Sequence, residues 1–131
     1  MRALLDRHGD AEAALAAGPA AWREAGIAAT RWPLLLQPDV ACLDADLAWL
    51  AIPGHHVIGW HQPDYPALLR QAPTPPGVLF IAGDPDLLWH PQLAIVGSRR
   101  PSAAGRDHAR QFAAAFAGRG LVVTSGLAEG V

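Results

Sequence analysis

Residues 93–125 read LAIVGSRRPSAAGRDHARQFAAAFAGRGLVVTS, and this stretch decides the fold class. Its two ends, LAIVG at 93–97 and LVVTS at 121–125, are apolar runs typical of parallel strands covered on both faces. The segment between them repeats apolar side chains at helical spacing, at Ala109, Phe112, Ala113 and Phe116. A strand, a helix and a strand in this order predict a right-handed βαβ unit and therefore an α/β fold.

The residues before this unit change in character at Gly54. Residues 1–53 contain short helical stretches bounded by capping residues. From Gly54 on, β-branched and aromatic residues occur in short runs broken by proline and glycine, and two runs, at 57–60 and 78–83, are typical of strands. We therefore predict a small helical domain over residues 1–53 and an α/β domain over residues 54–131.

Capping residues mark three helices within the first domain. Asp10 is a good N-cap for the first, Pro19 suits the first turn of the second, and Pro38 and Asp39 start the third. The third helix carries an apolar stripe at Val40, Leu43, Leu47 and Leu50. Helices this short are marginal alone, so we expect them to pack together.

The composition is that of a globular protein, with 51% apolar and 17% charged residues. The single cysteine, Cys42, excludes an intrachain disulfide and favours a reducing compartment, and we expect it to be buried. Tyr65 should have a buried ring with its hydroxyl satisfied locally.

Charged residues interrupt any signal-peptide core near the start, and no apolar run approaches the roughly 20 residues of a membrane span. We therefore predict a cytoplasmic protein without a membrane partner.

Charge is divided unevenly along the chain. Residues 1–96 contain five arginines and ten acidic side chains, a formal charge of −5, whereas residues 97–131 contain five arginines and two acidic side chains, a formal charge of +3. The net charge argues against a uniformly basic nucleic-acid-binding protein. A locally basic surface on a mildly acidic body is what an anion-binding site requires.

The loop between the first strand and the helix of the βαβ unit is the candidate site. It occupies residues 97–105, at the carboxyl end of a strand, where open α/β sheets bind ligands. The first helical turn leaves amide N–H groups without partners and carries part of the helix dipole, so a phosphate fits there. The residues that suit phosphate are Gly97 for close backbone approach, Ser98 and Ser102 for hydroxyl donors, and Arg99, Arg100 and Arg106 for guanidinium groups. Ser102 is also a plausible N-cap.

Signatures of common cofactors and metals are absent from the sequence. It has neither G-x-G-x-x-G nor G-x-x-x-x-G-K-[ST], and it contains no lysine. Two clusters of potential ligands lack the spacing of metal sites: His55, His56 and His61, and Asp84, Asp86 and His90. We predict no cofactor, no metal and no catalytic residue.

Four blocks of the sequence resemble, in order and spacing, the DNA-processing A (DprA/Smf) family. They are YPALL at 65–69, PPGVLFIAGD at 75–84, AIVGSRRPSAAGR at 94–106 and VVTSGLAEGV at 122–131. RHGDAEAALAAG at 7–18 and WREAG at 22–26 are similar to the small helical, sterile-alpha-motif-like (SAM-like) domain of some members. The resemblance identifies the chain as the amino-terminal portion of such a protein, with a Rossmann-like parallel sheet that is incomplete at its carboxyl end.

The resemblance implies a binding protein, not an enzyme. Members of the family bind single-stranded DNA through an extended Rossmann-like domain, protect incoming DNA and help to load the RecA recombinase in natural transformation. The family's phosphate pocket falls here on Gly97, Ser98 and Arg99, and Ser125 and Gly126 should line the same crevice. The implied partners are single-stranded DNA, RecA and a second copy of the chain.

Three other interpretations remain open. The glycines of the loop could simply form a turn, with the serines capping a helix and the arginines solvated. Related Rossmann-like folds hydrolyse nucleoside monophosphates, and the same pocket would then hold one nucleotide. The chain could also be an inert fragment in which only the helical domain folds.

Overall fold

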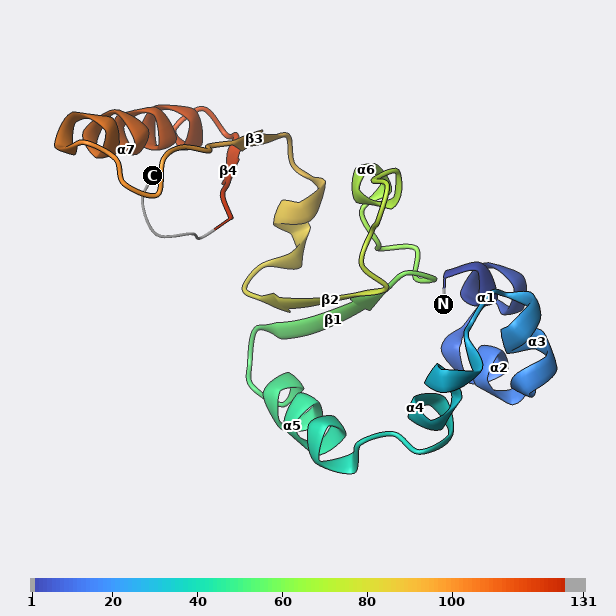
Figure 1. Cartoon of the computed structure of the whole chain (residues 1–131). Coiled ribbons are helices and arrows are strands. Elements are labelled where there is room, and N and C mark those ends of the chain that lie inside the picture. Colours follow the sequence, from blue (N-terminus) through green and yellow to red (C-terminus); the bar gives the residue numbers. More distant parts are fainter. Residues whose placement is uncertain (1, 127–131) are drawn as a thin grey trace. The chain divides into compact units, whose positions relative to one another are not determined.

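The computed structural model describes residues 2–126 of the chain. It contains two compact units, residues 1–85 and residues 86–131, which we call the amino-terminal and carboxyl-terminal units (Figure 1). The first holds short helices and an antiparallel strand pair, and the second holds a parallel strand pair with one long helix. The predicted mixture of helices and strands is therefore confirmed.

The amino-terminal unit begins with five short α-helices and a 3₁₀ turn. Their bounds are α1 Arg2–His8, α2 Ala11–Ala16, α3 Gly18–Glu24, η1 Ala29–Arg31, α4 Trp32–Leu36 and α5 Val40–Leu50. The predicted cap at Asp10 is confirmed, because its carboxylate accepts a hydrogen bond from the Ala13 amide. Asp39, which was predicted to start the third helix, caps it by accepting from the amides of Ala41 and Cys42. The sequence did not predict α1 or α4, and α4 has no side-chain cap.

Trp22 is the centre of the helical packing. Its side chain is 1% exposed, and its indole Nε1 donates to the Ala14 carbonyl oxygen at 2.9 Å. Leu4 and Leu5 of α1 are buried in the same unit, and Trp32 meets the Trp22 ring edge-on at 6.3 Å between centroids. The burial of these large side chains holds together helices that are each too short to persist alone.

An antiparallel pair of strands completes this unit. β1 His55–Gly59 pairs with β2 Val78–Ala82, and the connection between them contains α6 Ala67–Arg70. The expectation for Tyr65 is confirmed, because its ring is buried and its hydroxyl donates to the Pro76 carbonyl at 2.7 Å. A hydrogen bond of 2.7 Å from Trp60 Nε1 to Asp6 Oδ1 joins this connection to α1.

The carboxyl-terminal unit contains the predicted βαβ arrangement. η2 Pro85–Trp89 leads into β3 Gln92–Ala94, α7 Ala103–Ala117 follows, and β4 Val122–Thr124 pairs with β3 in parallel. The register places Leu93 opposite Val123. The strand, helix and strand expected from residues 93–125 are confirmed, although both strands are shorter than their apolar runs.

Several expectations about burial are wrong. The strand at 93–97 was expected to be covered on both faces, but Val96 is 84% exposed and Leu93 is only half-buried. In α7, the predicted stripe is half-buried at three positions, whereas Phe112 is exposed. The reason is that, within residues 2–126, the β1–β2 pair and the β3–β4 pair form two separate two-stranded sheets. β3 therefore pairs with β4 alone and has no extended sheet around it.

The boundary that we predicted at residue 54 lies between α5 and β1, where helices give way to strands. The division into compact units falls later, at Pro85. Independent folding of residues 1–53 stays a prediction, as does a SAM-like fold for them. None of the helices within residues 2–126 has the length and apolar character needed to cross a bilayer.

Helix α5 departs most from the expected packing. The side chains of Val40, Leu43 and Leu47 are exposed, and so is Cys42, which the sequence led us to expect inside. The Cys42 thiol instead donates to Asp39 Oδ2 at 3.3 Å. This hydrogen bond lowers the pKa of the Asp39 carboxyl, and the same bond, which stabilises the protonated thiol, raises the pKa of Cys42.

We therefore predict that Cys42 forms its thiolate at a higher pH than an ordinary exposed cysteine. The rate of alkylation by iodoacetamide, measured against pH, should show a raised midpoint. Replacing the carboxylate by a hydroxyl in Asp39→Ser, which keeps an N-cap oxygen, should move the midpoint down towards the ordinary value. An unchanged midpoint in this variant would contradict the assigned hydrogen bond.

Candidate phosphate site at the β3–α7 loop

The predicted loop lies where the sequence placed it, between β3 and α7. Beyond Ala94 the strand pairing continues for one more hydrogen bond, from the Ile95 amide to the Thr124 carbonyl at 2.9 Å. The chain then leaves the strand and enters α7 through Ser102. The loop therefore starts from the paired edge of the parallel strands, and it ends at the amino terminus of a 15-residue helix.

Ser102 organises the first turn of α7. It has extended backbone angles, and its Oγ accepts a hydrogen bond from the Gly105 amide at 3.1 Å, which confirms the predicted N-cap. The helical ladder begins with the Arg106 amide, which donates to the Ser102 carbonyl. The amides of Ala103 and Ala104 thus come before the first amide that donates within the helix, and they are the donors that a helix offers to an anion.

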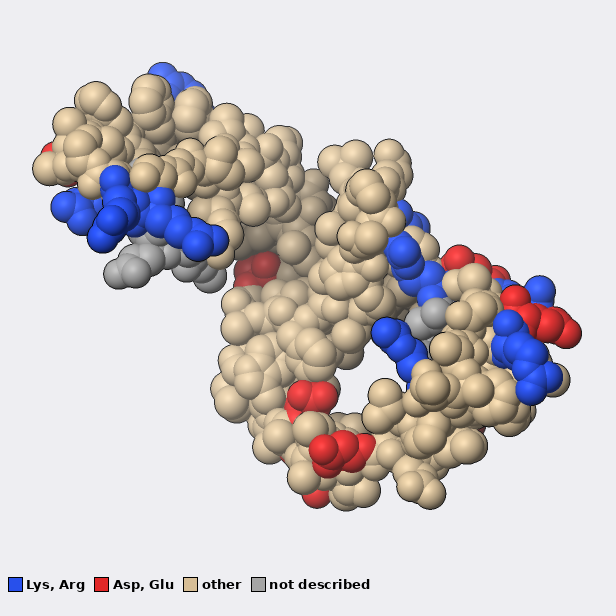
Figure 2. Space-filling model, in the orientation of Figure 1, with Lys and Arg blue, Asp and Glu red and all other residues tan. Residues whose placement is uncertain are grey.

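The arginines of the loop stand in solvent. Arg99, Arg100 and Arg106 are exposed and take part in no ion pair within residues 2–126. Arg110 lies 3.7 Å from the Asp107 carboxylate. Figure 2 shows basic side chains gathered along one side of the carboxyl-terminal unit, with little acidic surface among them. This surface attracts anions although the whole chain has a formal charge of −2.

The two serines have different roles in the structure. Ser98 Oγ accepts from the Arg100 amide at 3.0 Å and so shapes the turn that precedes the helix. Its hydroxyl proton remains a donor, because only the oxygen is used in this bond. Ser102 uses its oxygen in the cap in the same way. Both hydroxyls can therefore donate to a phosphate oxygen without breaking the loop.

Ser125 and Gly126 follow the end of β4, as expected. Ala94 pairs with Thr124 in the parallel register, so the chain leaves both strands at the same edge. The structure thus brings Ser125 to the edge from which the 97–106 loop starts. The rest of that sequence block, residues 127–131, lies outside the described residues.

The first-turn amides that the sequence predicted as phosphate donors are those of Ala103 and Ala104. The predicted N-cap at Ser102 fixes which amides come first in the helix. The sequence analysis did not assign these donors to individual residues, because alanine side chains carry no chemical signal.

The other clusters considered from the sequence do not form a site. Within residues 2–126 no group of three His, Cys, Asp or Glu side chains is arranged to hold a metal ion. A shallow pocket of about 540 Å³ is lined by Asp86, Trp89, His90 and Pro91, and another of about 510 Å³ lies beside α4. The 97–106 loop is an open surface, which suits an extended ligand better than an enclosed small molecule.

Comparison with known proteins adds three relatives and one family. The sequence profile described as DNA recombination-mediator protein A matches residues 56–131. The chain is 40% identical to protein Smf of Escherichia coli over 89 residues, and 38% identical to DNA processing protein DprA of Bacillus subtilis over 68 residues. Protein Smf of Synechocystis is 38% identical over 73 residues.

These three matches cover 68%, 51% and 53% of this chain and 24%, 23% and 18% of the respective relatives. The chain thus spans about a quarter or less of the length of the curated relatives that it matches. No solved structure matches the chain significantly.

The capping role of Ser102 can be tested directly. We predict that Ser102→Ala lowers the local stability of the first turn of α7 by about 1 kcal/mol, because the Gly105 amide loses its acceptor. Amide hydrogen exchange along α7 measures this. Ser98→Ala is the matched control, since it removes a hydroxyl that bonds only within the preceding turn. Equal effects of the two variants on α7 would contradict the assignment.

Proposed function

The chain belongs to the DNA recombination-mediator protein A (DprA/Smf) family, and from this premise we propose that it binds the phosphate backbone of single-stranded DNA through residues 97–106. The observation that carries the proposal is the coincidence of two kinds of donor. Exposed guanidinium groups that form no ion pair within residues 2–126 lie in the same loop as helix amides without intrahelical acceptors.

The proposed contacts divide by chemistry. The amides of Ala103 and Ala104 and the hydroxyls of Ser98 and Ser102 donate to phosphate oxygens at the helix terminus. Arg99 and Arg100 pair with the same or neighbouring phosphates, and their planar guanidinium groups match two oxygens at once. Arg106, one turn into α7, extends the basic surface along the strand. Ser125 and Gly126 border it at the end of β4.

This set of contacts predicts binding that is largely independent of base sequence. Phosphate contacts fix the register of a nucleic-acid strand without reading its bases. Residues 97–106 contain no amide or carboxylate side chain, and the arginine and serine side chains that could also contact a base edge are assigned here to phosphates. A protein that accepts any incoming strand requires this lack of selectivity.

The same premise supports a role in DNA uptake and recombination. We propose that the chain's protein protects single-stranded DNA, helps to load the RecA recombinase and assembles with a second copy in the cytoplasm. The support is family membership. The chemistry proposed is binding without catalysis, and its support is likewise family membership.

The experiment is a fluorescence-anisotropy titration of a labelled oligo-dT strand at several salt concentrations. Arg99→Ala should weaken binding about tenfold, the effect of one lost charge-assisted hydrogen bond. It should also reduce the single-strand salt slope by about 0.7 if one phosphate contact is lost. Unlabelled duplex of the same length, added as a competitor, reports the preference for single strands.

Arg119→Ala is the matched control. It removes the same charge from the same unit, but at the other end of α7, where the guanidinium bonds to the Ala115 carbonyl. Equal weakening by the two variants would assign binding to general charge and contradict a site in the loop. A folded chain that does not bind oligo-dT would support the inert fragment, and release of a free base from nucleoside monophosphates would support the hydrolase.

A further inference from the structure

Trp89, the last residue of η2, presents an indole ring to solvent. It is 53% exposed, whereas the other four tryptophans are buried or half-buried. Each of those four meets another aromatic ring: Trp22, Trp32, Trp49 and Trp60. Within residues 2–126, Trp89 makes no ring contact of this kind. A large flat ring in solvent is a surface on which a planar ligand can stack.

The Trp89 ring borders a shallow pocket in the carboxyl-terminal unit. The pocket has a volume of about 540 Å³ and is lined by Asp86, Trp89, His90 and Pro91. Its lining contains a carboxylate and no guanidinium group, which disfavours a phosphate as its occupant. The exposed His90 imidazole can donate or accept a hydrogen bond. An aromatic face beside such a group suits a nucleobase, which is flat, uncharged and polar along its edge.

Hydrogen bonds hold this pocket on the parallel strands. The side-chain amide of Gln92, the first residue of β3, donates to the Leu87 carbonyl of η2 at 3.3 Å. The oxygen of the same Gln92 amide accepts from the Thr124 hydroxyl of β4 at 2.6 Å. Trp89 is therefore positioned at the start of β3, and the 97–106 loop follows the other end of the same strand.

A single strand of DNA is long enough to reach from the loop to Trp89. The stretch of chain from Pro91 to Gly97 spans at most about 20 Å, because an extended chain advances about 3.3 Å per residue. Stacked nucleotides repeat about every 3.4 Å along a strand, so about six nucleotides cover this distance. A strand whose phosphates bind at the loop can therefore place a base on Trp89.

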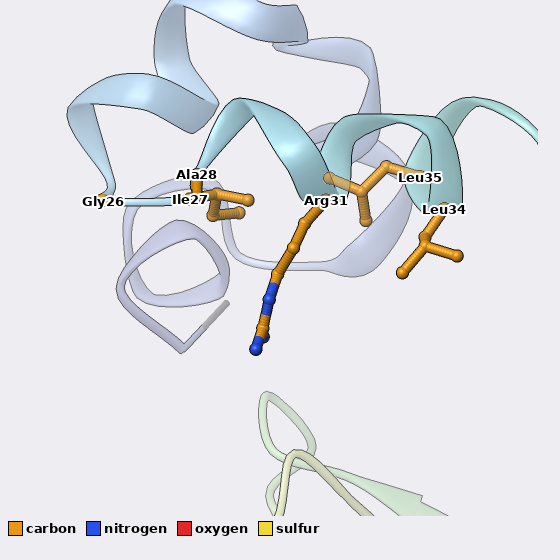
Figure 3. A pocket seen from close by; sticks show the side chains of 6 residues that line it. All are labelled: Gly26, Ile27, Ala28, Arg31, Leu34 and Leu35. Carbon is orange, nitrogen blue, oxygen red and sulfur yellow. The ribbon is translucent and has the colours of Figure 1, made fainter.

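The pocket beside α4 lacks an aromatic surface. It has a volume of about 510 Å³ and is lined by Gly26, Ile27, Ala28, Arg31, Leu34 and Leu35. Figure 3 shows the Arg31 side chain extending away from the helices, with Ile27 to one side and Leu34 to the other. These lining residues include no ring on which a base could stack. Of these two pockets, the one beside Trp89 is the better fit to a base.

From these observations we propose that Trp89 stacks against a base of the bound single strand, with His90 at the edge of that base. The inference rests on the proposed function, and it adds a contact with the bases to the phosphate contacts of the loop. Every base has a flat face, so stacking on Trp89 holds a strand without selecting its sequence. The stacked base gives about tenfold tighter binding.

The test compares oligo-dT with a strand of the same length whose sugars carry no bases, by fluorescence anisotropy of the labelled strands. The two strands have the same phosphates, so the difference between their affinities measures the contacts with bases. The unaltered chain should bind oligo-dT about tenfold more tightly than the abasic strand. Trp89→Ala should remove most of this preference, and it should leave the affinity for the abasic strand unchanged. Trp89→Phe, which keeps an aromatic face, should retain most of the preference.

Leu87→Ala is the matched control. Leu87 lies in the same 3₁₀ turn and is 44% exposed, but it does not line the pocket, so its truncation should leave the preference unchanged. Equal affinity of the unaltered chain for both strands, or a preference that survives Trp89→Ala, would overturn the base contact while phosphate binding at the loop stands. A folded chain that binds neither strand would overturn the proposed function and this inference together.

Discussion

The parallel pairing of β3 with β4 is the constraint on which the candidate site depends. Parallel strands require a crossover, and α7 is that crossover, so its amino terminus must begin near the edge where β3 ends. The loop that connects them therefore places helix amides and the end of β4 at one edge of the strand pair. Without this pairing, the arginines of residues 99–106 would be an ordinary solvated run.

The charge distribution favours the binding of an anion at this edge, although the chain as a whole is acidic. Long-range attraction depends on local charge, and residues 97–131 have a formal charge of +3 although the chain as a whole has −2. The acidic residues of α5 lie in the other unit. Net charge alone gives no sign of an anion-binding surface, whereas the division of charge along the chain places one in residues 97–131.

Local signals in the sequence predicted local structure well. The 93–125 pattern predicted β3, α7 and β4, Asp10 and Ser102 were identified as caps, and Asp39 was identified as a helix start, because periodicity and capping are decided within a few residues. Burial was predicted poorly. The α5 stripe, Cys42 and Val96 are apolar yet exposed, since an apolar pattern shows which surface seeks a partner and not which partner covers it. The first-turn amides of the site were predicted as a group from the helix start at Ser102, although no individual residues were assigned to them.

The central claim is that phosphate binds at the β3–α7 loop, and the most direct measurement is the titration of amide chemical shifts with oligo-dT. We predict saturable shifts that are largest for Ser98 to Arg106, including the amides of Ala103 and Ala104, and that vanish at high salt. Shifts that are concentrated in the amino-terminal unit, or that are absent from this loop while the DNA is bound, would contradict it.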